Sequence, residues 1–126
     1  MKLHSPSTAG LLAITGYDAE HIAVNGRRLT RSFLLTPQRL IEDWSPASFD
    51  DLTEADLQAV ADLECPIVLL GTGLRQRFPA PALMRSLIKR RIGVEVMDSH
   101  AACRTYNILM AEGRDVAAAL IVECAH

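Results

Sequence analysis

Aromatic residues, cysteines and long apolar runs are all scarce in this sequence of 126 residues. The longest uninterrupted apolar stretches, Val116–Val122 and Ile67–Leu70, fall far short of the roughly 20 residues that a membrane-spanning helix needs. The opening residues, 1–6, contain no apolar segment of the kind found in a secretory signal. We therefore expect no integral membrane segment, no export signal and a cytoplasmic protein.

The few potential metal ligands lack the spacing of a metal site. Cys65, Cys103 and Cys124 are an odd number of cysteines at wide intervals, no CxxC pair occurs, and the four histidines are scattered. Without an export signal these thiols are expected to be reduced. The sequence predicts neither a metal site nor a bound cofactor.

An excess of charge of either sign is also missing. The formal net charge is −2, which argues against binding to duplex nucleic acid. The chain is 49% hydrophobic and 22% charged, values that exclude a disordered or low-complexity protein. A length of 126 residues is typical of one domain, so residues 1–126 are expected to form a single unit.

The first half of the chain has the pattern of β structure, which defines a predicted β-hairpin region over residues 10–35. Residues 10–16 are suited to a short strand, and residues 20–24 alternate between two faces. Asn25-Gly26 then gives a strong hairpin signal, because a type I′ turn needs positive φ at both central residues. We predict an antiparallel hairpin over residues 20–35, with residues 27–35 as its returning strand, and an irregular connection over residues 36–50.

The second half, residues 53–122, alternates between helix and strand. A helix is predicted after Thr53, where Thr53 and Asp56 resemble a capping box, and another over residues 81–92, with a stripe of Leu83, Met84, Leu87 and Ile88. Gly93 is predicted to end that helix as its C′ residue. A third helix runs from Asp98 or Ser99 to about residue 111 and ends at Gly113. Strands are expected at residues 67–70, 94–97 and 115–122.

This order predicts an α/β (α+β) fold in a single layered domain. The N-terminal antiparallel hairpin sheet is joined to a βαβαβ sheet with parallel or mixed strands. Right-handed crossovers pack helices on that sheet, which we expect on one side.

Charge is sorted along the chain. Residues 42–64 hold eight acidic residues and no Lys or Arg, whereas residues 65–94 hold six basic residues and no acid. This pattern indicates either a docking face for a charged partner or ordinary solvated helices whose charges match the helix dipoles.

One candidate site emerges from the parallel strands. Ligands gather beyond the carboxyl ends of such strands, and two loops begin there, residues 71–77 and 98–107. We expect both loops to lie side by side along one rim and to offer backbone N–H groups and arginines to a small anion. The candidate anion- or ligand-binding residues are Gly71, Thr72, Gly73, Arg75, Arg77, Asp98, Ser99, Arg104 and Asn107.

Cys103 is the candidate nucleophile. It lies close to a helix N-terminus beside Arg104, with His100 one turn earlier, and such surroundings lower a thiol pKa. The alternative is a buried cysteine that packs as a small apolar side chain.

Three segments together resemble a known family: residues 68–73, residues 93–98 and residues 102–109. The chain is similar to a small family of domains of unknown function that includes mitochondrial complex I assembly factor three and an adipogenesis-associated domain protein, of which it looks like a bacterial member. The resemblance implies a compact domain of mixed sheets and helices and a soluble accessory role in assembly, without a catalytic residue.

Two functions are compatible with these features. The first is a non-catalytic assembly or protein-interaction factor with a protein partner, for which the resemblance implies respiratory complex I assembly. The alternative is a small-molecule or anion-binding enzyme with Cys103 as a thiol nucleophile.

Overall fold

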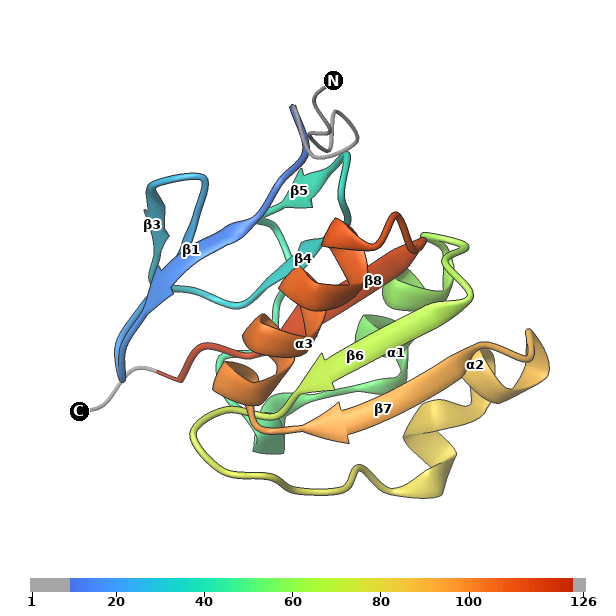
Figure 1. The fold of residues 1–126 in the computed structure, drawn as a ribbon. Helices are drawn as coiled ribbons and strands as arrows, with labels where there is room; N and C mark the ends of the chain where they lie inside the picture. Colours follow the sequence, from blue (N-terminus) through green and yellow to red (C-terminus); the bar gives the residue numbers. More distant parts are fainter. Residues whose placement is uncertain (1–9, 124–126) are drawn as a thin grey trace.

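Two β-sheets and three α-helices make up the computed structural model, which describes residues 10–123 (Figure 1). The smaller sheet contains β1 (Ile14–Tyr17), β2 (Ile22–Val24) and β3 (Arg27–Leu29) in that order. The larger, five-stranded sheet has the order β5-β4-β8-β6-β7 and consists of β5 (Leu40–Ile41), β4 (Phe33–Leu35), β8 (Val116–Leu120), β6 (Ile67–Gly71) and β7 (Gly93–Met97). The helices are α1 (Glu54–Ala61), α2 (Arg85–Lys89) and α3 (Ser99–Ala111), with short 3-10 turns η2 (Phe49–Asp51) and η3 (Pro81–Met84).

The mixed α/β class predicted from the sequence is confirmed by these sheets. β6 pairs in parallel with both β7 and β8, and β4 pairs antiparallel with β8. The central strand β8 is Val-Ala-Ala-Ala-Leu and is buried throughout. Small alanine side chains allow α3 to approach this strand closely.

The expectation that the helices cover one side of the sheet is wrong. One apolar cluster joins α3 and the three-stranded sheet to one face, through Tyr106, Ile22, Leu69 and Ala118. A second cluster joins α1 and α2 to the other face, through Leu57, Leu87 and Val68. Figure 1 shows α3 in front of β6 and β8, with α1 behind them. Successive residues of β6 point to opposite faces, so its continuous apolar run supplies both clusters.

The predicted hairpin is confirmed at its turn and wrong in its length. Asn25 and Gly26 have φ values of 48° and 86°, and β2 pairs antiparallel with β3. The returning strand ends at Leu29, however, and residues 33–35 form β4 in the other sheet. Phe33 pairs there with Leu120, a contact between distant parts of the chain that local alternation cannot reveal.

In place of the helix predicted over residues 81–92, the structure has a shorter helix that ends at a different residue. η3 covers its first residues and α2 only residues 85–89. Arg91, with φ of 56°, ends the helix, and the N–H of Ile92 donates to the carbonyl of Leu87 as in a Schellman motif. Gly93 instead begins β7. The other predicted C′ glycine, Gly113, does have a positive φ of 78°.

Candidate functional site

The two loops singled out in the sequence lie side by side, joined by direct hydrogen bonds. The N–H of Thr72 donates to the carbonyl of Met97 at 2.9 Å, and the N–H of Ser99 donates to the carbonyl of Gly73 at 2.8 Å. The Ser99 hydroxyl accepts from the N–H of Gly73 at 2.9 Å and donates to the carbonyl of Ile121 at 2.7 Å. Along this rim, the backbone groups of the two loops and the Ser99 hydroxyl are therefore hydrogen-bonded to one another.

The glycine turn is filled by a carboxylate of the chain itself. Glu123 follows β8, and its carboxylate accepts from the N–H of Leu74 and from the N–H of Phe49, each at 3.3 Å. A Cβ on Gly73, whose φ is +104°, would collide with this carboxylate. A Cβ on Gly71 would lie only 2.9 Å from the Cα of Ser99. These glycines thus admit Ser99 and Glu123.

Thr72 organises the loop that follows β6. Its hydroxyl donates to the carbonyl of Arg75 at 2.7 Å and accepts from the N–H of Arg77 at 3.1 Å. The side chain is buried, so these bonds satisfy a hydroxyl that would otherwise be costly to bury. Thr72 is thus a turn-forming residue in this structure.

Two of the three arginines of the candidate site bond to separate side chains. Arg77 donates to Asp50 at 2.7 Å, lies over the ring of Phe49 and holds the pKa of Asp50 below its usual value. Arg104 donates to the hydroxyl of Tyr17 at 2.9 Å. Arg75 is exposed.

Cys103 is fully buried within α3. Burial is the main cause that raises the pKa of this thiol to about 12, and the nearby Arg104 offsets only part of that effect. His100 stacks on Tyr17 and its ring nitrogen bonds with the carbonyl of Asp18 at 2.9 Å. A buried, protonated thiol is poorly suited to nucleophilic attack.

The other two candidates on the second loop stabilise the fold. Asp98 caps α3 by accepting from the N–H of Ala101 at 2.8 Å. The Asn107 amide accepts from the N–H of Ile14 and donates to the carbonyl of the same residue, both at 2.8 Å. This paired contact fixes β1 to α3. The sequence singled out Asn107 as a candidate binding residue, but gave no sign of its partner, which lies 93 residues earlier.

Part of the sorted charge is paired within the molecule. Ion pairs join Arg77 to Asp50 at 2.7 Å and Arg90 to Asp62 at 2.9 Å, and Arg85 lies 4.0 Å from Glu54. Residues 42–64 and residues 65–94 therefore face each other at these pairs. Within residues 10–123 no group of three or more metal-ligating side chains is present.

An open groove lies on a different part of the surface, beside the connection from β5 to η2. We call it the acidic groove; its volume is about 750 Å³ and its acids are Glu42, Asp43, Asp51 and Glu123, with Arg31 as the base. Trp44 contributes to its wall and is anchored by an indole N–H that donates to the carbonyl of Asp56 at 3.0 Å. The sequence carries no local signal for this groove, because it forms only where residues 30–32, 42–51 and 122–123 meet.

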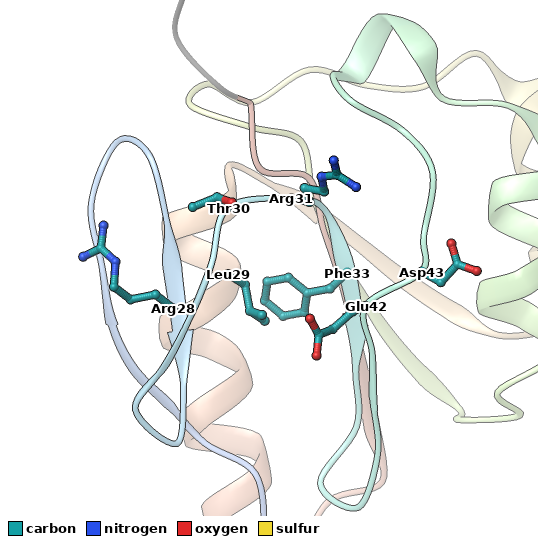
Figure 2. A pocket seen from close by; sticks show the side chains of 7 residues that line it. All are labelled: Arg28, Leu29, Thr30, Arg31, Phe33, Glu42 and Asp43. Atoms are coloured by element: carbon teal, nitrogen blue, oxygen red, sulfur yellow. The ribbon is translucent and has the colours of Figure 1, made fainter.

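A second hollow of about 370 Å³ adjoins the acidic groove and shares Thr30, Arg31, Glu42 and Asp43 with it. Figure 2 shows its lining, with Leu29 and Phe33 between the Arg28 and Glu42 sides. Glu42 is held by an ion pair with Arg27 at 2.9 Å. Because they share these residues, the two hollows form one concave surface.

Comparison with known proteins identifies close similarity over most of the chain. Residues 14–121 match the family model described as a protein of unknown function (DUF498/DUF598). The chain is 38% identical to NADH dehydrogenase (ubiquinone) 1 alpha subcomplex assembly factor 3 of Bos taurus over 110 residues, which cover 86% of this chain and 59% of that protein. The chain thus spans about three-fifths of the length of this relative.

Solved structures show the same fold. A crystal structure of a Bordetella parapertussis protein has a TM-score of 0.85 and 39% identity, covering 90% of this chain and 98% of that one. A solution structure of a Bordetella pertussis protein, described as a Mth938-like domain, has a TM-score of 0.83 and 33% identity, covering 98% and 94%. The family resemblance predicted from the sequence is confirmed.

Proposed function

Because the chain belongs to the DUF498/DUF598 family of proteins of unknown function, we propose that it acts as a non-catalytic assembly factor that binds a protein partner. The observation that carries this proposal is the similarity over 86% of the chain to a relative named as a complex I assembly factor. From that similarity, we propose that this chain assists the assembly of respiratory complex I.

The geometry of the candidate site supports a non-catalytic role. Cys103 is buried, and the glycine turn already holds the carboxylate of Glu123. Catalysis needs reactive groups that can reach a substrate, and these groups are engaged in holding the fold.

The acidic groove is the proposed partner site. Asp43 and Asp51 form no ion pair within residues 10–123, whereas Glu42 is paired with Arg27 and Glu123 is held in the glycine turn. The Asp43 and Asp51 carboxylates outnumber the one base of the groove, Arg31, and favour a basic segment of the partner, since opposite charges steer and orient an encounter. Trp44 and Pro46 line the same groove, and both are buried, so each exposes only a small apolar area to it. We therefore expect a segment that combines basic and apolar side chains.

Deletion and complementation in an organism that carries the chain tests this function. We expect deletion to reduce the amount of assembled complex I, measured on native gels and as NADH:ubiquinone oxidoreductase activity, and the wild-type chain to restore it. The double variant Asp43→Lys/Asp51→Lys should restore several-fold less complex, because both exposed carboxylates line the groove.

Two controls accompany that experiment. Glu112→Lys changes an exposed acid beyond the end of α3, outside the groove, and should restore assembly fully. Cys103→Ala should also restore assembly once circular dichroism shows that it is folded. Normal levels of complex I in the deletion strain would contradict the proposed function.

A further inference from the structure

The connection from β6 to β7 exposes an unusual amount of apolar surface. We call residues 72–92 the basic segment. Its side chains Leu74, Phe78 and Ile88 are 54%, 74% and 65% exposed, and only Ile108 joins them among the large exposed apolar residues of the described chain. Ile88 belongs to the apolar stripe predicted for this region, yet it points to solvent while Leu87 is buried. Three of the four large exposed apolar residues of the described chain therefore lie in this one segment.

The same segment carries positive charge that the fold does not neutralise. Arg77, Arg85 and Arg90 face acids of the neighbouring segment. Arg75, Lys89 and Arg91 are exposed and form no ion pair within residues 10–123, although Arg75 also lowers the pKa of Asp50 from a distance.

The backbone of the basic segment runs along one border of the molecule (Figure 1). β7 is the edge strand of the larger sheet, and α2 contacts it. Figure 1 shows the basic segment running along the outer side of β7, away from the three-stranded sheet. Gln76 attaches the segment to that strand, since its side-chain amide donates to the carbonyl of Val96 at 2.9 Å.

We propose that the basic segment binds the surface of a membrane that contains anionic phospholipids. Leu74, Phe78 and Ile88 insert at the level of the headgroups, and Arg75, Lys89 and Arg91 contact the phosphates. Apolar side chains buried at the headgroup level and basic side chains attracted to anionic lipids together attach a protein to a membrane surface. Unpaired bases are attracted to an anionic lipid surface. This attachment is peripheral, and no helix within residues 10–123 has the length and apolar character to cross a membrane.

Sedimentation with lipid vesicles tests this proposal on the purified full chain. We expect binding to phosphatidylcholine vesicles that contain about one-quarter phosphatidylglycerol at low salt, and little binding to pure phosphatidylcholine. About 1 M salt should release the protein, because it shortens the Debye length to about 3 Å. The double variant Arg75→Gln/Lys89→Gln should bind on the order of tenfold or more weakly, given the attraction of each base to an anionic surface.

The chain offers a matched apolar control. Ile88→Ala should weaken binding several-fold, whereas Ile108→Ala, which removes the same side chain at 59% exposure on α3, should leave binding unchanged. For the bases, Arg39→Gln/Arg114→Gln removes two exposed charges outside the segment and should also have no effect. Thermal unfolding of each variant confirms that it is folded.

Absence of binding to anionic vesicles at low salt would overturn the proposal, as would equal losses in the test and control variants. Equal binding to pure phosphatidylcholine would overturn it as well, because the bases would then have no role. The measurement uses only the purified chain and lipid, so its outcome is independent of the proposed assembly function.

Discussion

At the scale of single residues, Gly73 and Glu123 show how the chain fills its own candidate site. Gly73 has a φ of +104°, a conformation that residues with a side chain rarely adopt, and the Glu123 carboxylate occupies the space beside its Cα. That carboxylate also receives the N–H groups of Leu74 and Phe49. A glycine turn that resembles an anion-binding loop thus accommodates an internal anion.

We expect Gly73→Ala to destabilise the protein by about 2 kcal/mol or more, because it combines an unfavourable φ with a steric collision. Urea unfolding followed by circular dichroism measures the change. Gly93→Ala is the matched control, since a Cβ there meets its nearest neighbour at an ordinary 3.6 Å and φ is not positive. An equal loss of stability in both variants would contradict this account of Gly73.

At the scale of elements, α1 connects the groove to the core. The Thr53 hydroxyl accepts from the N–H of Asp56 at 3.2 Å, and the Asp56 carboxylate accepts from the N–H of Thr53 at 3.0 Å. Asp56 also receives the hydroxyl of Ser45 at 2.7 Å, and its carbonyl receives the indole of Trp44. The start of this helix therefore fixes one wall of the acidic groove.

Thr53→Ala should cost about 1 kcal/mol of folding stability, because an N-terminal N–H group of α1 loses its acceptor. Chemical denaturation gives the value. Thr53→Ser retains the hydroxyl and should lie within about 0.5 kcal/mol of the wild type. If the alanine and serine variants are equally stable, the capping box contributes nothing measurable.

At the scale of the whole molecule, two buried thiols make stability depend on alkaline pH. Burial is the main cause that raises the pKa of both Cys65 and Cys103 to about 12, and the Asp115 carboxylate adds to the effect at Cys65. An unfolded thiol ionises near pH 8.5. Since the folded pKa is the higher one, the stabilisation is complete below about pH 8.5 and is lost as pH rises toward 12.

Above pH 8.5 we therefore expect the free energy of unfolding to fall by up to about 1.4 kcal/mol per pH unit for each buried thiol. Urea unfolding between about pH 7.5 and 10 measures this slope, a range that ends near the pH where unfolded tyrosines such as Tyr106 begin to ionise. Cys103→Ala should remove about half of the slope while lowering the stability at neutral pH. An unchanged slope in that variant would show that Cys103 makes no contribution.

Much of the secondary structure was predictable because its causes are local. The Asn25-Gly26 turn, the capping box of Thr53 and Asp56 and the C′ residue Gly113 each act within a few residues, and all three occur as predicted. The continuous apolar run of β6 likewise indicated a strand. Because the carboxyl ends of parallel strands lie at one edge of a sheet, the sequence also predicted that the loops after β6 and β7 meet. The hydrogen bond from the N–H of Ser99 to the carbonyl of Gly73 joins these two loops.

Only the tertiary structure decided where the chain places its distant partners. It assigned Phe33–Leu35 to the larger sheet through β8, fixed Asn107 to Ile14 and placed the Glu123 carboxylate in the glycine turn. It also formed the acidic groove from three separate segments. The sequence determines the elements through interactions between near neighbours, whereas sheet order and the occupants of a surface depend on contacts between residues far apart in the chain.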